Sequence, residues 1–302
     1  MQTLETIRDY IRWGASQFTE AKLFHGHGTA TAIDDAAALV LHSLYLPYDL
    51  AECYFGSKLT PVERVKITDL INRRVNERIP SAYLMQEAVF AGLTFYVDQR
   101  VLVPRSPFAE LIKEQFSPWV DPDKVHRVLD LCTGSACIAI ACAYAFPDAH
   151  IDAVDLSTDA LEVAKINLAK HKLEDQLSLY QSDLFSALPA QKYDLIVSNP
   201  PYVAISEWEQ LPDEFHAEPE MGFTGGESGL DLVIKILFDA AEYLTEQGIL
   251  IIEVGSSAET LKSQFSNIPF YWLEFEQGGD GVFLLTAEQV FTFNEQFKKA
   301  MG

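Results

Sequence analysis

Hydrophobic positions along the chain follow two different periods. Up to about residue 85 they are spaced as on one face of a helix, which predicts helices over 4–17, 33–46 and 60–79. The third helix has the clearest start, because Thr60-Pro61-Val62-Glu63 combines a capping box with proline at the first helical position. We expect it to end before Pro80, since the residue before a proline disfavours helical backbone. The pattern predicts an N-terminal helical domain over residues 1–88.

The spacing changes to that of strands over residues 89–103. Apolar runs at 89–97 and 101–103 flank the polar sequence Asp98-Gln99-Arg100. Two apolar runs around a short polar break are typical of a β-hairpin. We therefore expect a linking hairpin over residues 89–104, between the helical domain and the rest of the chain.

Strands and helices alternate from residue 105 to residue 302. The predicted strands are 127–132, 150–155, 177–181, 193–198, 248–254, 270–275 and 282–286. Helical spacing falls between them at 107–117, 137–146, 158–171, 230–246 and 257–265. Such alternation predicts an α/β fold, with helices on both faces of a mainly parallel sheet. Only Glu276 to Gly281 joins the last two strands, too short a link for a parallel crossover, so this pair should be antiparallel.

The charge of the chain is strongly acidic and unevenly distributed. Its 302 residues are 48% hydrophobic and include 44 Asp and Glu against 22 Lys and Arg, a formal net charge of −22. No Lys or Arg occurs between Tyr193 and Ile234, a stretch with the acids Glu207, Glu209, Asp213, Glu214, Glu218, Glu220, Glu227 and Asp231. Such a surface repels phosphates, which disfavours direct DNA binding, and attracts a basic partner such as a protein. The alternative is that these acids only solubilise a loop.

Several functional classes are disfavoured by the composition. Cys53 stands alone, and Cys132, Cys137 and Cys142 match neither a zinc spacing nor a disulfide framework, so we expect no metal. His25-Gly26-His27 is interpreted as a loop. Neither a signal peptide nor an uncharged apolar run long enough to cross a bilayer is visible. We expect a cytoplasmic protein that does not act at a membrane.

The sequence Asn199-Pro200-Pro201-Tyr202 ends the predicted strand at 193–198. Neither proline has an N–H to donate, so the ladder of strand hydrogen bonds stops there and backbone carbonyls are left for a ligand. The Asn199 amide adds a second acceptor, and Tyr202 adds an aromatic ring. Two acceptors beside a ring suit a planar –NH2 group, which predicts chemistry on an amide or exocyclic amine nitrogen. The alternative is a turn that merely ends the strand.

Three consecutive predicted strands end at or near an aspartate. The first leads into Asp130-Leu131-Cys132-Thr133-Gly134-Ser135-Ala136, whose small residues let the backbone turn tightly beside a ligand. The second ends at Asp155, where an acid can accept hydrogen bonds from ribose hydroxyls, and Asp183 follows the third. Because the carboxyl ends of parallel strands meet at one edge, we expect a nucleoside site there. Structurally, Asp155 could instead assist a helix start, and Asp130 could orient loop amides.

The loop is a poor match for a dinucleotide site. Gly134-Ser135-Ala136-Cys137-Ile138-Ala139 lacks two of the three glycines that cradle a pyrophosphate, and three acids disfavour that group. A nicotinamide-dependent dehydrogenase is therefore disfavoured. The acids favour a ligand with no phosphate and a positive centre. S-adenosylmethionine, with its sulfonium, ribose hydroxyls and adenine amine, is the predicted cofactor.

With these motifs in this order, the chain resembles the class I S-adenosylmethionine-dependent methyltransferases. The resemblance narrows to the protein-(glutamine-N5) methyltransferases on the helical domain, the hairpin, Val103-Pro104-Arg105-Ser106-Pro107 and Ile251-Ile252-Glu253-Val254-Gly255. It favours the branch that modifies a large-subunit ribosomal protein, whose basic character suits the acidic stretch. The sister branch, which modifies peptide-release factors, usually reads Pro-Arg-Pro-Asp-Thr-Glu where this chain has Pro104-Arg105-Ser106-Pro107-Phe108-Ala109. The resemblance implies a Rossmann-like, seven-stranded, mostly parallel sheet and methyl transfer to a glutamine amide nitrogen.

The resemblance also implies roles for the motif residues. Asn199 and Pro200 would each accept one amide N–H of the substrate, and Tyr202 would form a wall against the flat amide. Pro201 would hold Pro200 extended, and the N-terminal domain would recognise the substrate. The implied cofactor contacts are Asp130, Cys132, Thr133, Gly134, Ser135, Ala136, Asp155, Leu156, Asp183, Leu184 and Asn199.

Two departures from the family pattern affect the cofactor loop and the adenine contact. Family loops often read Gly-x-Gly-x-Gly, whereas Cys132 and Ala136 occupy the outer positions here. Leu184 stands where relatives can carry an aromatic ring against the adenine. The alternatives are a release-factor methyltransferase, a nucleic-acid exocyclic-amine methyltransferase and a binding module without catalysis.

Overall fold

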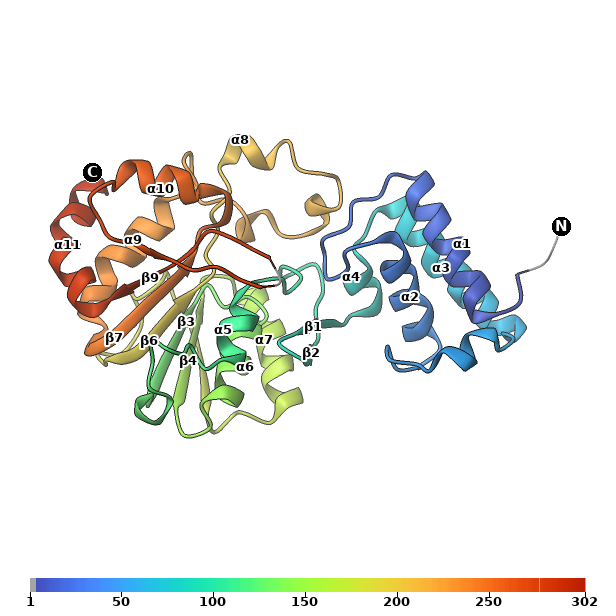
Figure 1. The fold of residues 1–302 in the computed structure, drawn as a ribbon, viewed down its shortest axis with the longest axis horizontal. Coiled ribbons are helices and arrows are strands. Elements are labelled where there is room, and N and C mark those ends of the chain that lie inside the picture. The colour runs from blue at the N-terminus through green and yellow to red at the C-terminus, as the bar shows by residue number, and fades with distance from the viewer. Residues whose placement is uncertain (1–3, 277, 302) are drawn as a thin grey trace.

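Residues 4–85 form a helical unit with a hydrophobic core of its own in the computed structural model, which describes residues 4–276 and 278–301. Its helices are α1 (Ile7–Glu20), α2 (Ala32–Ser43), α3 (Pro61–Glu77) and α4 (Ser81–Met85). The first three confirm the predicted helices, and α4 is an unpredicted addition. Thr60 caps α3 as predicted, because its backbone N–H donates to the Glu63 carboxylate at 2.7 Å and Glu63 N–H donates back to its hydroxyl. Figure 1 shows this helical unit at one end of the molecule.

The linking hairpin is present, but its predicted turn is wrong. Strands β1 (Ala88–Phe90) and β2 (Leu93–Phe95) pair antiparallel around Ala91 and Gly92, whose φ angles are 49° and 79°. A two-residue turn with positive φ at both positions matches the twist of the flanking strands. The sequence Asp98-Gln99-Arg100 makes a separate turn, in which Asp98 accepts the Arg100 N–H at 3.0 Å, and residues 101–103 form no strand.

The larger unit is built on a sheet of mostly parallel strands. Its strands are β3 (Arg127–Leu131), β4 (His150–Asp155), β5 (Leu177–Gln181), β6 (Tyr193–Ser198), β7 (Leu244–Glu253), β8 (Tyr271–Trp272) and β9 (Val282–Thr286). In the described part of the chain these seven form one sheet in the order β5-β4-β3-β6-β7-β9-β8. Strand β9 runs antiparallel to both neighbours, which confirms the predicted pairing of the last two strands. The fold is α/β and Rossmann-like, as expected.

Helices cover both faces of this sheet because its central strands are apolar on both faces. On one face, alternate strand residues such as Val128 and Leu195 share a core with α5 (Phe108–Lys113), α6 (Cys137–Ala145) and α7 (Thr158–His171). On the other face, Leu129 and Ile196 share a core with α9 (Asp231–Asp239), α10 (Ala258–Gln264) and α11 (Ala287–Ala300). Helix α11 was not predicted, although Thr286 and Gln289 form a capping box at its start.

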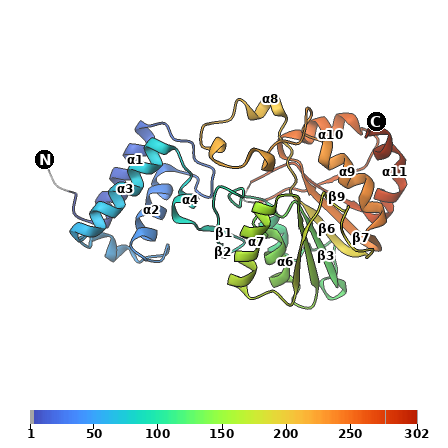
Figure 2. The same cartoon turned by 180° about the vertical axis from the view of Figure 1, so that it is seen from behind.

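The strand order places a ligand site between β3 and β6. The chain runs from β3 outward to β4 and β5, then returns to β6 on the other side of β3 and continues to β7. In an open parallel sheet, ligands bind beyond the carboxyl ends of the strands at such a reversal. The segment after β6, with α8 (Ile205–Trp208), extends from the sheet toward the N-terminal helices in both views (Figures 1 and 2). We name residues 204–229 the roof segment.

Candidate active site

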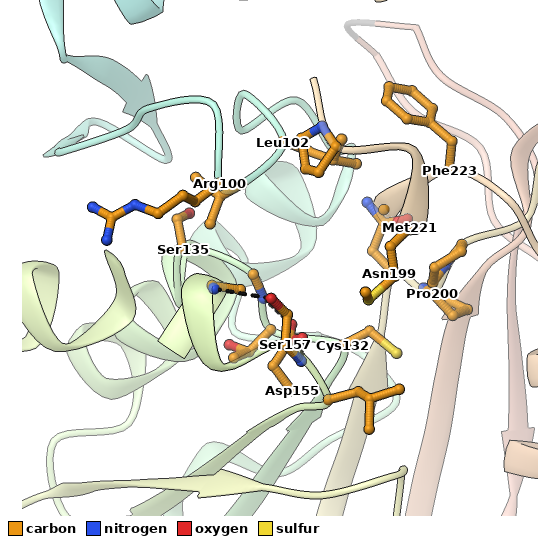
Figure 3. A pocket seen from close by; sticks show the side chains of 18 of the residues that line it. Arg100, Leu102, Cys132, Ser135, Asp155, Ser157, Asn199, Pro200, Met221 and Phe223 are labelled. Atoms are coloured by element: carbon orange, nitrogen blue, oxygen red, sulfur yellow. Dashed lines mark hydrogen bonds between the residues drawn. The ribbon is translucent and has the colours of Figure 1, made fainter. Parts of the chain in front are cut away.

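A cavity of about 500 Å³ lies at the carboxyl edge of the sheet, where the strand order reverses. The loops after β3, β4, β5 and β6 line it, together with residues 99–106 and part of the roof segment. Most predicted site residues meet there: Cys132, Thr133, Gly134, Ser135, Asp155, Leu156, Asp183, Leu184, Asn199, Pro200, Pro201 and Tyr202. In Figure 3, Met221 and Phe223 of the roof segment lie on the side of Asn199 and Pro200, away from Asp155 and Ser157. We call these the roof side and the cofactor side.

The loop after β3 turns through three residues with left-handed backbone. Cys132, Gly134 and Ala136 have φ angles of 60°, 56° and 62°. A residue with a Cβ pays roughly 1–2 kcal/mol for this conformation, whereas glycine adopts it freely. The alternation of glycines in the family pattern therefore has a conformational cause. The loop of this chain keeps the same path with Cys132 and Ala136 at a conformational cost.

The structure corrects the placement of two predicted cofactor contacts. Asp130 and Ala136 are fully buried and do not line the cavity. One Asp130 oxygen accepts the Thr133 hydroxyl at 2.5 Å and the Ala139 N–H at 3.1 Å, so the side chain orients the loop, as the structural alternative proposed. Burial raises the pKa of Asp130 to about 7. The sequence alone does not distinguish a strand-end acid that bonds to its own loop from one that faces the cavity.

The other two aspartates lie at the rim of the cavity. Asp155 accepts the Gly134 N–H at 2.8 Å and the Ser157 N–H at 2.9 Å, which joins the loops after β3 and β4. Burial raises its pKa, and the two amide bonds oppose that shift. Asp183 is half-exposed and pairs with Lys235 Nζ of α9 at 2.7 Å. This pair was not predicted, because Lys235 is 52 residues away in the sequence.

Asn167 supports the cofactor side of the cavity and was not among the predicted site residues. This fully buried side chain of α7 donates to the Ser135 carbonyl at 3.0 Å. Its amide group also exchanges hydrogen bonds with both backbone groups of Tyr96, at 2.7 and 3.0 Å. Asn167 thereby ties the linker to the loop after β3. The sequence shows only an asparagine in a predicted helix. The role of Asn167 becomes recognisable once its burial is known.

Asn199 and Pro200, which carry the predicted acceptors, both line the cavity. Among the hydrogen bonds of residues 4–276 and 278–301, none involves the Asn199 carboxamide or the Pro200 carbonyl. The backbone just beyond is fixed, because Ser257 Oγ donates to the Tyr202 carbonyl at 2.7 Å and Val203 N–H donates to the Phe223 carbonyl at 2.8 Å. The role of the Pro200 carbonyl as an acceptor for a ligand stays a prediction.

The buried Glu253 carboxyl group, which was not among the predicted site residues, holds Tyr202. Its hydroxyl donates to one Glu253 oxygen at 3.1 Å, and the Ser106 hydroxyl donates to the other at 2.6 Å. Burial raises the pKa of Glu253 to about 7 and that of the Tyr202 hydroxyl well above its usual range. The ring lies against Gly255, where an added Cβ would come within 2.5 Å of it. Glu253 thus joins the end of β7 to two lining segments.

The acidic stretch divides into exposed and buried residues. Glu207, Glu209, Asp213, Glu220, Glu227 and Asp231 are exposed. Glu214 and Glu218 are buried. Glu214 contacts Arg78 of the helical domain, and Glu218 contacts Arg105 just after the linker, so neither acid takes part in a solvated surface. The predicted acidic surface is therefore confirmed for six of the eight acids and wrong for the other two.

The residues at the rim of the cavity suit the ribose hydroxyls and the adenine of S-adenosylmethionine. Asp155 and Asp183 supply oxygen acceptors at the rim, and Leu156 and Leu184 supply apolar surface. Within the described residues, no group of three or more His, Cys, Asp or Glu side chains could hold a metal ion. In the same part of the chain, no helix combines the length and apolar character that a bilayer span requires.

Part of the chain matches a methyltransferase family model, and its fold matches a solved methyltransferase domain. Residues 113–216 match the family model of the methyltransferase small domain. The fold matches the hMettl16 catalytic domain, solved with the MAT2A 3′UTR hairpin 6, at a TM-score of 0.51 and 17% identity, covering 76% of this chain and 83% of that one. This likeness concerns the fold alone. It confirms the Rossmann-like fold on which class I methyltransferases are built.

Two curated relatives identify the particular family. The ribosomal protein uL3 glutamine methyltransferase of Francisella tularensis is 47% identical over 99% of this chain and 96% of its own length. The protein of the same name from Bordetella pertussis is 48% identical over 96% of this chain and 98% of its own length. The chain belongs to the family of ribosomal protein uL3 glutamine methyltransferases.

Proposed function

We propose that the protein transfers a methyl group from S-adenosylmethionine to the side-chain amide nitrogen of a glutamine in ribosomal protein uL3. The observation that carries the chemistry is the pair of free acceptors, Asn199 and Pro200, at the end of β6 in the cavity. The observation that carries the substrate is the name of two nearly full-length relatives. We infer that the reaction takes place in the cytoplasm, because ribosomal proteins are made there.

The chain's own residues would orient the glutamine amide. An amide nitrogen is a weak nucleophile because its lone pair is delocalised into the carbonyl, so alignment has to supply much of the rate. The Asn199 side-chain oxygen and the Pro200 carbonyl each accept one N–H of the substrate –NH2 group. These bonds fix the plane of the amide and strengthen as positive charge develops on nitrogen. Tyr202 packs against the flat face, and Pro201 keeps Pro200 extended.

The cofactor side would hold the methyl donor. S-adenosylmethionine supplies an electrophilic methyl group on a sulfonium when it is bound. We assign the ribose hydroxyls to Asp155 and the adenine edge to Asp183 and Leu184, with the loop around Gly134 against the rest of the nucleoside. Leu184 gives apolar contact without ring stacking.

Replacement of Asn199 by alanine tests the proposed chemistry. We expect Asn199→Ala to lower methyl transfer to purified uL3 by at least a hundredfold, because one of two aligning acceptors is lost. Mass spectrometry of uL3 peptides measures the gain of 14 Da on glutamine. The matched control is Asn72→Ala, which removes an exposed asparagine of α3. Near-normal transfer by Asn199→Ala would contradict the assigned role.

The same assay separates the alternative substrates. Purified peptide-release factor and naked ribosomal RNA are offered beside uL3 at equal concentration. The proposal expects label on uL3 alone, since the exposed acids around the roof segment repel RNA phosphates. Label on release factor or RNA in preference to uL3 would overturn it.

A further inference from the structure

The Glu218 carboxylate lies where the roof segment, the linker and the helical domain meet. Its Oε2 accepts the Val103 N–H at 2.8 Å and Arg105 Nη1 at 3.0 Å. Its Oε1 accepts Arg105 Nη2 at 2.8 Å, and His27 Nε2 lies 2.9 Å away. The Glu218 side chain has no exposed surface, and that of His27 is 3% exposed. One roof residue is therefore bound by three groups from outside the roof segment.

The charge of Glu218 is held in place by these partners. Burial on its own raises the pKa of this carboxyl, but the His27 contact and the Arg105 guanidinium outweigh burial and lower the pKa below its usual value. The carboxylate is consequently ionised at neutral pH. A buried charge of this kind is strongly destabilising when one partner is removed. The contacts therefore resist separation of the roof segment from the linker.

The residues around Glu218 form the roof side of the cavity. Phe215, Pro219, Met221 and Phe223 all line it. The Arg105 guanidinium lies 5.4 Å from the centre of the Phe215 ring and 5.6 Å from that of Phe223. The Arg105 nitrogens thus bind Glu218, and the same guanidinium group packs against two aromatic rings that line the cavity.

A second tie reaches the helical domain through Glu214. This fully buried carboxylate lies 3.0 Å from Arg78 Nη2 and 4.0 Å from Arg74 Nη1. Arg74 in turn contacts Asp35 of α2 at 3.1 Å. The two acids, Glu214 and Glu218, flank Phe215 and connect the same part of the roof to the helical domain.

We propose that Glu218 is a positioning residue, whose contacts with Arg105 and His27 let the helical domain hold the roof over the Asn199 side of the cavity. This inference rests on the proposed function, because that side is where the substrate glutamine would bind. The helical domain then shapes the active site in addition to any direct recognition of the substrate. Cofactor contacts at Asp155 and the Gly134 loop lie outside this network.

The test compares two charge-neutralising substitutions in the same segment. Glu218→Gln removes the buried charge, and Glu220→Gln removes an exposed charge two residues away. We expect Glu218→Gln to raise the KM for uL3 at least tenfold while the Kd for S-adenosylmethionine changes less than threefold. Hydrogen exchange of the amides of residues 215–223 should accelerate at least tenfold, with little change in β3 and β4. Glu220→Gln should leave the Kd and the exchange rates unchanged and raise the KM less than twofold, because a single exposed charge contributes little across solvent.

A purely structural role would give a different result. If Glu218→Gln raised the KM and the Kd by the same factor, or accelerated exchange equally across the sheet, the positioning role would be overturned. The same conclusion would follow if Glu218→Gln matched Glu220→Gln in every measurement. If the parent protein did not methylate uL3, the proposed function would be overturned. The hydrogen-exchange experiment would still decide whether Glu218 positions the roof segment.

A second variant isolates the contribution of the helical domain. His27→Ala removes its contact with Glu218 and leaves both Arg105 hydrogen bonds. We expect a KM increase of roughly threefold, and a double variant with Glu218→Gln should show less than the product of the two single effects. This variant also carries the test if Glu218→Gln does not fold. Independent, multiplicative effects would show that His27 does not act through Glu218.

Discussion

The cofactor side and the roof side of one cavity are built in different ways. The cofactor side comes from the loops after β3, β4 and β5, which neighbouring parallel strands bring to one edge, and its main tie is the Asp155 bond to Gly134, 21 residues away. The roof side is joined by side chains far apart in the sequence, such as Arg105 and Glu218, separated by 113 residues. Sheet topology therefore fixes one side, whereas buried charge fixes the other. Substitutions should affect them separately.

The largest expected effect on the cofactor side comes from Asp155. Asp155→Ala removes the predicted ribose acceptor and the bonds to Gly134 and Ser157. We expect the Kd for S-adenosylmethionine to rise about a hundredfold, equivalent to about 3 kcal/mol. Isothermal titration calorimetry measures it, with Asp148→Ala, an exposed aspartate, as the control. An unchanged Kd would remove Asp155 from the cofactor site.

A buried carboxyl group lies near each side of the cavity, Asp130 under the loop after β3 and Glu253 behind Tyr202. Burial raises the pKa of each group to about 7. The folded protein holds these protons at pH values where the unfolded chain has released them. Each group's contribution is therefore fully present below the unfolded pKa, near 4, and is lost as pH rises toward 7, by about 3 kcal/mol each. Asp130→Asn and Glu253→Gln should each flatten the decline of the unfolding free energy between pH 5 and 7.

Urea unfolding at several pH values measures this decline for the parent and both variants. A parent stability that does not fall between pH 5 and 7 would show that neither carboxyl group holds its proton in the folded state. A flattening in only one variant would show which side of the cavity excludes water more completely.

Salt concentration should affect the KM for uL3 and the Kd for the cofactor differently, by a smaller factor than the Asp155 substitution. The exposed acids of the roof segment are expected to attract basic uL3 across solvent, where ions screen charge. Raising NaCl from 50 to 300 mM should therefore increase the KM for uL3 roughly tenfold and change the cofactor Kd less than twofold. Replacing Glu207, Glu209 and Glu227 together by glutamine should reduce this salt dependence. Equal salt effects on both ligands would contradict electrostatic recruitment.

The smallest expected effect concerns the left-handed residues of the loop after β3. Ala136→Gly should stabilise the protein by about 1 kcal/mol or less, because glycine relieves the cost of a φ of 62° but gains freedom in the unfolded chain. Thermal unfolding detects this change, and Ala141→Gly within α6 should have the opposite sign. A loss of stability in Ala136→Gly would show that the Ala136 methyl group contributes more by packing than its backbone conformation costs.

Most of the fold and the cofactor side could be predicted from the sequence because their signals are local. Apolar runs, caps and strand-end residues identified the strands β3 to β9 and brought Asp155, Asp183 and Asn199 to one edge. The hairpin turn was misplaced, because Asp98-Gln99-Arg100 is as good a polar turn as Ala91-Gly92 by composition, and only the pairing of β1 with β2 distinguishes them. Helix α11 had a readable cap at Thr286.

The end of β6 was predictable from local sequence, because two prolines cannot donate hydrogen bonds and the strand ladder therefore stops there. The acceptor roles of Asn199 and Pro200 stay predictions. Which acids line the cavity became known only from the packing of distant segments. Asp130 turned under its loop, Glu253 came to lie behind Tyr202, and Glu218 became a buried partner of Arg105. The reason is physical, because the role of a carboxylate depends on its burial and its partners, and both are set by contacts between distant parts of the chain.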